Sequence, residues 1–138
     1  MIIIDSKQLY ERLREFFPKN IDLMRHLNEG ACWEYIIREK SIDDEKTKLK
    51  YYLHKKTEDT LEMTQENPEI EPDLILYFTE KAILNLIEGE PDAEEYYSRY
   101  KERMYNPKPG LEIDNKINKS RLKLFAKGYR KWQSDFNF

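Results

Sequence analysis

The sequence predicts a single α+β domain, in which helices pack mainly on one face of a five-stranded, largely antiparallel sheet. Three observations lead to this fold class. The length of 138 residues fits one domain. The spacing of apolar residues changes along the chain between the helical period of about 3.6 and the strand period of two. Three consecutive strand-like segments are joined by connections too short for a parallel crossover, so they are expected to pair antiparallel.

Residues 5–30 are predicted to form two helices. Apolar side chains recur at helical spacing from Leu9 to Phe17, which places them on one face of an amphipathic helix. A second, shorter helix begins near Asn20. Gly30 stands where a helix commonly ends in a left-handed residue.

Residues 31–65 are predicted to form an antiparallel meander of three strands. Apolar residues alternate with polar ones in each strand, so one face of each is expected to be buried. The inward residues are Trp33, Tyr35 and Ile37, then Leu49, Tyr51 and Leu53, then Leu61 and Met63. Residues 66–73 follow as an acidic connector with no strand or helix pattern. Its carboxylates lack the central glycine of a calcium loop, which favours a solvated turn.

Residues 74–105 are predicted to form a strand and two helices, and residues 111–133 a strand and a C-terminal helix. The segment from 74 to 78 is apolar on both faces, which indicates a central position in the sheet. Thr79 and Asp92 are expected to cap the first two of these helices, because their side chains can accept backbone N–H groups.

The predicted C-terminal helix has an apolar face and a basic face. Its apolar stripe is formed by Leu122, Phe125, Ala126, Tyr129 and Trp132. Residues 111–138 hold seven basic and three acidic residues, a net +4, which leaves −7 for the rest of a chain whose net charge is −3. The basic residues mostly opposite the stripe are Lys119, Arg121, Lys123, Lys127, Arg130 and Lys131. This face is either a solvated helix surface or a site of transient contact with an anionic membrane surface.

The composition narrows the class of protein. Aromatic residues make up 13% of the chain, which argues against disorder. The longest apolar runs, residues 1–4 and 74–78, are too short to span a membrane. Cys32 is the single cysteine, so no internal disulfide forms, and a reducing, cytoplasmic location is expected. A net charge of −3 argues against nucleic acid as the main partner.

No group of residues in the sequence indicates an enzyme, a metal site or a cofactor. His26 and His54 lie on different predicted elements, and neither stands beside a nucleophile motif. Cys32, next to Trp33 in a strand, is typical of a small packed residue. The four isolated glycines form no phosphate-binding loop, and no Cys and His pair has zinc spacing. We therefore expect a non-enzymatic protein without a cofactor.

One segment in the second half of the chain combines several motifs. A proline–aspartate pair ending at Asp73 leads a strand, Thr79 caps a helix that ends at Gly89, and a proline-containing turn precedes the aromatic residue Tyr96. In these motifs, between residues 72 and 97, the chain resembles the sterol carrier protein two family. The order of the predicted elements from residue 6 to residue 133 is also that of the family.

The resemblance implies a sterol-carrier-like fold with a hydrophobic cavity between the sheet and the helices. It also implies non-enzymatic binding or carriage of a hydrophobic ligand, such as a lipid, a fatty acid or an acyl-CoA. The residues expected to line the cavity are Phe78, Ile83, Leu86, Ile87, Tyr96, Tyr100, Leu122, Phe125 and Trp132. Tyrosines suit an amphipathic ligand, because the ring packs while the hydroxyl takes a polar partner.

A second hypothesis keeps the same fold but fills the cavity. The aromatic residues are then plain core, which is expected in a chain with four alanines and no valine. In that case the protein is an interaction or structural domain, which docks on a partner or forms a homodimer through an exposed aromatic patch.

Overall fold

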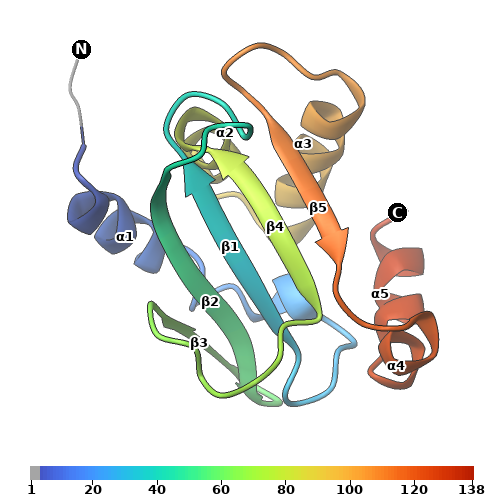
Figure 1. The fold of residues 1–138 in the computed structure, drawn as a ribbon. Coiled ribbons are helices and arrows are strands. Elements are labelled where there is room, and N and C mark those ends of the chain that lie inside the picture. Colours follow the sequence, from blue (N-terminus) through green and yellow to red (C-terminus); the bar gives the residue numbers. More distant parts are fainter. Residues whose placement is uncertain (1–3) are drawn as a thin grey trace.

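A five-stranded sheet crosses the computed structural model, which describes residues 4–138 (Figure 1). The strands are β1 (Cys32–Arg38), β2 (Thr47–Thr57), β3 (Thr60–Thr64), β4 (Leu74–Thr79) and β5 (Ile113–Ile117). They lie in the order β3-β2-β1-β4-β5, and every neighbouring pair is antiparallel except β1 and β4, which are parallel. The predicted fold class is confirmed. The first three residues of the predicted domain lie outside the described part of the chain.

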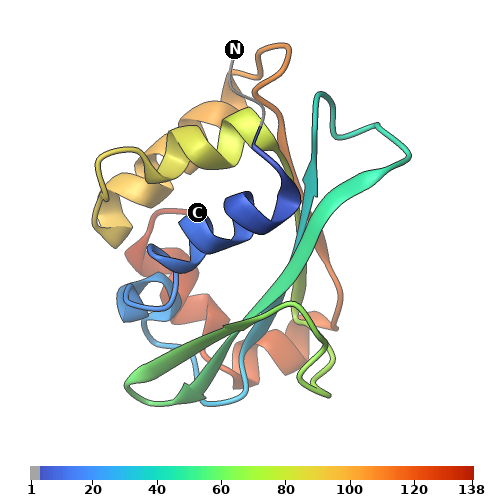
Figure 2. The same cartoon turned by 90° about the vertical axis from the view of Figure 1, so that its left-hand side faces the viewer.

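The helices lie on one side of this sheet, as Figure 2 shows. They are α1 (Ser6–Arg14), the short 3₁₀ helix η1 (Ile21–Met24), α2 (Glu80–Ile87), α3 (Ala93–Tyr105), α4 (Arg121–Ala126) and α5 (Tyr129–Asp135). Helix α1 is shorter than its apolar pattern suggests, because Phe16 and Phe17 follow it in turns and are nevertheless buried. Among the described residues, no helix is both long enough and apolar enough to cross a membrane.

The predicted meander and the inner position of the fourth strand are both present. Tyr35 of β1 pairs with Tyr51 of β2 and with Leu76 of β4, so β1 is the middle strand. The acidic connector carries the chain from β3 at one edge of the sheet to β4 on the far side of β1. Thr79 and Asp92 cap α2 and α3 as predicted, through hydrogen bonds from backbone N–H groups.

The predicted C-terminal helix is wrong in one respect, because the structure has two short helices in its place. Gly128 breaks the segment between α4 and α5 with a φ of 98°, a left-handed conformation that continues no helix. The break changes which side chains point inward. Leu122 is 82% exposed, whereas Leu124, which was not on the predicted stripe, is buried.

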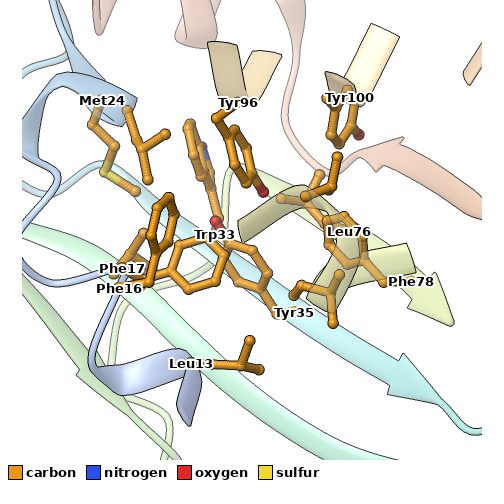
Figure 3. Packing of buried hydrophobic residues seen from close by; sticks show 14 of the residues in the cluster. Leu13, Phe16, Phe17, Met24, Trp33, Tyr35, Leu76, Phe78, Tyr96 and Tyr100 are labelled. Atoms are coloured by element: carbon orange, nitrogen blue, oxygen red, sulfur yellow. The ribbon is translucent and has the colours of Figure 1, made fainter. Parts of the chain in front are cut away.

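Aromatic rings form the centre of the core between the sheet and the helices (Figure 3). Tyr35 stacks on Tyr51 with ring centroids 4.6 Å apart and on Phe78 at 5.8 Å, which makes a row across three strands. Phe17 covers this row from the helical side, and Tyr96 packs against Phe17. Such ring pairs add stability beyond the area that they bury, and they supplement the buried leucine and isoleucine side chains of the same core.

The close approach at Gly128 leads to a test of the C-terminal packing. A Cβ atom at this position would lie 2.1 Å from the backbone oxygen of His26, and the φ of 98° is unfavourable for any other residue. We expect Gly128→Ala to lower the free energy of unfolding by at least about 2 kcal/mol, because the strain and the clash add. Urea unfolding measures this loss.

Gly89 offers the matched control for this variant. Its φ is 77°, but a Cβ atom there would meet nothing within 4 Å. Gly89→Ala is therefore expected to show the conformational cost alone, about 1 kcal/mol. Equal losses for the two variants would contradict a tight contact between the C-terminal segment and the loop at His26.

Candidate ligand-binding pocket

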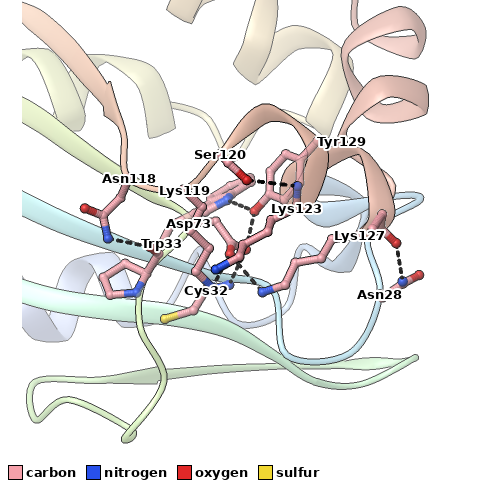
Figure 4. A network of polar contacts seen from close by, with 12 residues as sticks. Asn28, Cys32, Trp33, Asp73, Asn118, Lys119, Ser120, Lys123, Lys127 and Tyr129 are labelled. Carbon is pink, nitrogen blue, oxygen red and sulfur yellow. Dashed lines mark hydrogen bonds and ion pairs between the residues drawn. The ribbon is translucent and has the colours of Figure 1, made fainter.

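The buried carboxylate of Asp73 joins the sheet to the C-terminal segment (Figure 4). One oxygen, Oδ2, accepts hydrogen bonds from the Tyr129 hydroxyl at 2.7 Å and from the backbone N–H of Cys32 at 3.2 Å. The other, Oδ1, lies 2.8 Å from the Lys119 ammonium and 2.9 Å from that of Lys127. Four groups from distant parts of the sequence therefore meet on one side chain that is fully buried.

These partners determine the charge state of Asp73. Burial by itself raises the pKa of the carboxyl, but the hydrogen bonds from Lys119, Lys127, Tyr129 and Cys32 outweigh it, and the pKa is lower than usual. The hydroxyl of Tyr129 is in turn held neutral, because burial and the nearby Asp73 raise its pKa. The indole of Trp33 donates to the same hydroxyl at 2.8 Å, which fixes the Tyr129 ring beside β1.

A pocket of about 420 Å³ lies between the inner face of β1, β4 and β5 and the helices α3, α4 and α5. The sheet contributes Trp33, Tyr35, Leu74, Leu76, Asn115 and Ile117 to its lining. The helices and the residues after them contribute Tyr96, Tyr97, Tyr100, Arg121, Leu124, Phe125, Tyr129, Trp132, Gln133 and Phe138. Figure 3 shows Tyr96 and Tyr100 pointing from α3 toward Tyr35 and Leu76 on the strands.

Several of the pocket's aromatic side chains are held in place by their polar ends. The Tyr97 hydroxyl and the Trp132 indole both donate to the backbone oxygen of Leu23, at 2.7 and 2.9 Å. The Tyr100 hydroxyl accepts from the amide of Asn115 at 3.2 Å. Each of these rings therefore has one preferred orientation and presents its apolar face to the pocket.

The wall of the pocket carries little charge. Burial raises the pKa of Tyr100 to about 12 and the pKa of Tyr35, Tyr96 and Tyr97 well above the usual value, so these hydroxyls stay neutral. Among the described residues that line it, Arg121 is the one with a permanent charge. The exposed side chains of Asn115, Arg121 and Gln133 supply the polar part of the lining.

No family model matches this chain, and no curated protein matches it. Among solved structures, its fold is similar to that of sterol carrier protein 2 from Yarrowia lipolytica in the apo form. The two chains are 16% identical, with a TM-score of 0.45, over 82% of this chain and 80% of that chain. What this chain binds has to be argued from its own residues.

The structure brings four of the nine predicted cavity residues to the pocket. Tyr96, Tyr100, Phe125 and Trp132 line it. The residues Phe78, Ile83, Leu86 and Ile87 are buried in the core and do not line the pocket. Leu122 is also outside the lining, on the exposed side of α4.

Sequence reasoning missed the strand residues of the pocket lining, since the one strand residue that it named, Phe78, does not line the pocket. Strand β4 is apolar on both faces, so its sequence does not show that Leu74 and Leu76 point inward. The alternation in β1 places Trp33 and Tyr35 on the inner face, and that signal was available. It could not show that the helices leave a space over these residues, whereas the β2 residues with the same pattern are covered by α1.

The predicted basic face divides into two groups. Lys119 and Lys127 turn inward to Asp73, and their side chains are only 13% and 28% exposed. Arg121, Lys123, Arg130 and Lys131 are exposed. Contact of any of these residues with a membrane remains a prediction.

Other candidate reactive groups lie apart from the pocket lining. Burial raises the pKa of the Cys32 thiol to about 12, and the nearby Asp73 adds to this effect, so the side chain is a neutral packed thiol. Among residues 4–138, no three His, Cys, Asp or Glu side chains gather as they would around a metal ion.

The Asp73 network predicts a specific loss of stability. Asp73→Asn removes the charge that pairs with Lys119 and Lys127 and the second oxygen that accepts from Tyr129. We expect the free energy of unfolding at pH 7 to fall by about 3 kcal/mol, because cations are left beside an uncharged buried group. Urea unfolding measures this difference, and Asp59→Asn, in the exposed turn between β2 and β3, is the control.

The same network predicts how stability depends on pH. Because the folded pKa of Asp73 is lowered, its contribution is complete above the unfolded value of about 3.9 and is lost as pH falls through the folded value. The difference between wild type and Asp73→Asn should therefore shrink below about pH 4. A constant difference from pH 7 to pH 3 would contradict this role.

Proposed function

We propose that this protein binds or carries a hydrophobic ligand with a polar head, such as a lipid, a fatty acid or an acyl-CoA, without catalysing a reaction. The observation that carries the proposal is the pocket, whose lining combines aromatic and aliphatic side chains with few polar groups. A volume of about 420 Å³ is within the range of ligand sites. An apolar chain in it is stabilised by roughly 25 cal/mol for each Å² removed from water.

The polar groups of the lining suggest how such a ligand would be oriented. Asn115, Arg121 and Gln133 are exposed, whereas Trp33 and Tyr35 are buried. The chain of the ligand would lie against the buried rings, and its head would remain near the exposed groups. The Arg121 guanidinium favours a carboxylate or phosphate head, because it donates several hydrogen bonds and keeps its charge. The lone, buried Cys32 supports a reducing, cytoplasmic location as part of this proposal.

A second candidate function is a protein-interaction or structural domain of the same fold. It is favoured by the large apolar side chains on the surface, such as Tyr105, which is 74% exposed, and Leu122, which is 82% exposed. In this case side-chain motion would fill the pocket, and the exposed residues would contact a partner or a second copy of the chain.

Native mass spectrometry of the freshly purified protein separates the two functions. A bound ligand is expected as an added mass of a few hundred daltons that disappears after extraction with organic solvent. A bare mass, as a monomer or as a dimer, would contradict carriage and support the second candidate.

A pair of tryptophan substitutions tests whether the pocket is the binding site. Leu76→Trp places a large ring in the pocket, so binding of a fluorescent fatty-acid analogue should weaken at least tenfold with a modest loss of stability. Leu86→Trp inserts the same ring into closely packed core on α2 and should cost about 1–3 kcal/mol through overpacking. Titration and thermal unfolding measure the two effects. A large loss of stability in both variants would show that the space at Leu76 is not open.

A further inference from the structure

We propose that the rim of the pocket between β5 and α4 is a docking surface for an anionic lipid membrane. The proposal rests on the proposed function, since a membrane is where an amphipathic ligand would be taken up or released. The surface consists of the apolar side chains of Ile117, Leu122 and Phe125 together with the cations around them. It differs from the predicted basic face, because it includes apolar residues and leaves out Lys119 and Lys127.

The apolar part of the surface is exposed beside the pocket. Ile117 is 60% exposed and Phe125 39% exposed, and both also line the pocket. Leu122 is 82% exposed and follows Arg121, a lining residue, in the first turn of α4. Large apolar side chains on both sides of one opening are unfavourable in water, so they suit a surface that is itself apolar below its headgroups.

The charged part of the surface comes from the same stretch of sequence. Residues 115–134 include seven lysines and arginines and no acidic residue. Two of the seven neutralise Asp73. Arg121, Lys123 and Arg130 form no ion pair within the described residues, and the Arg130 guanidinium lies 5.7 Å from the centre of the Phe125 ring. The cluster stands on a chain whose net charge is −3, so an anionic surface would attract this side and repel the rest.

The combination of the two parts favours a membrane over other anionic partners. A nucleic acid presents phosphates along its whole backbone and would leave Leu122 and Ile117 against charged groups. A bilayer with anionic lipids offers phosphates and carboxylates to the cations and acyl chains to the aliphatic side chains. A ligand that leaves the pocket at this rim would then enter the bilayer without crossing water.

Vesicle co-sedimentation with full-length variants tests the docking surface. The probes are vesicles of phosphatidylcholine alone and vesicles that also contain phosphatidylserine. Wild type is expected to bind the second kind and to be released by salt. Leu122→Glu should weaken this binding at least tenfold, because the apolar contact is replaced by a charge that the membrane repels. Lys123→Gln and Arg130→Gln should each weaken it about fivefold, as expected for one cation near an anionic surface.

Tyr105→Glu is the matched control, because Tyr105 is also large and 74% exposed but lies at the end of α3, outside the pocket lining. It should change vesicle binding less than twofold. Equal effects of Leu122→Glu and Tyr105→Glu would overturn the proposal. Vesicle binding that depends on Lys123 and Arg130 but not on Leu122 would also overturn it, since the membrane would then be held by charge alone and the apolar rim would take no part. Binding that is insensitive to phosphatidylserine and salt would overturn it as well.

A measurement without vesicles separates this proposal from the proposed function. Leu122 does not line the pocket, so Leu122→Glu should bind a fluorescent fatty-acid analogue in solution as wild type does. If wild type binds vesicles as expected but not the analogue, the proposed function fails and the docking surface is supported. If it binds the analogue but no vesicle, the docking surface fails alone.

Discussion

The position of the C-terminal segment depends on one buried carboxylate. Asp73 stands where the acidic connector enters β4, and its partners come from β1 (Cys32) and from the last twenty residues (Lys119, Lys127 and Tyr129). Helices α4 and α5 have six and seven residues, lengths at which a helix is not stable by itself in water. They therefore need an external anchor, and the ion pairs and hydrogen bonds of Asp73 supply it. Because these helices form one wall of the pocket, the pocket depends on the same carboxylate.

The break at Gly128 determines which side chains of α4 and α5 point inward and which point to solvent. A continuous helix would have turned Leu122 inward with Phe125 and Trp132. With the break, α4 has its own orientation, in which Leu124 is buried and Leu122 points to solvent. The lysines divide in the same way, because those near Asp73 become part of the interior network and the others stay on the surface. One glycine thus accounts both for the exposed apolar residues beside the pocket and for the error in the predicted stripe.

Much of the fold could be predicted because short-range patterns in the sequence determine its strands and helix caps. Alternation in β1 and β2 and caps such as Thr79 are short-range signals, and each of them holds in the structure. The role of Asp73 is not local, since its partners lie up to 56 residues away and a carboxylate among acidic neighbours is typical of a solvated turn. For the pocket, helical spacing identified inward residues on α3 such as Tyr96. It could not show that Leu86, on the same kind of face, meets packed core, because that depends on how helices sit over the sheet.

The aromatic composition also explains how a space can persist inside so small a domain. Flexible aliphatic side chains would relax into a cavity, but rigid rings fill space only in particular orientations. Here the rings around the pocket are held at their outer ends, Tyr97 and Trp132 by the Leu23 carbonyl, Tyr100 by Asn115 and Tyr129 by Asp73. Moving any of them inward to close the space would break a hydrogen bond and leave a buried polar group without a partner, which costs about 1–3 kcal/mol. The polar ends that stabilise the core are therefore the same groups that keep the pocket from collapsing.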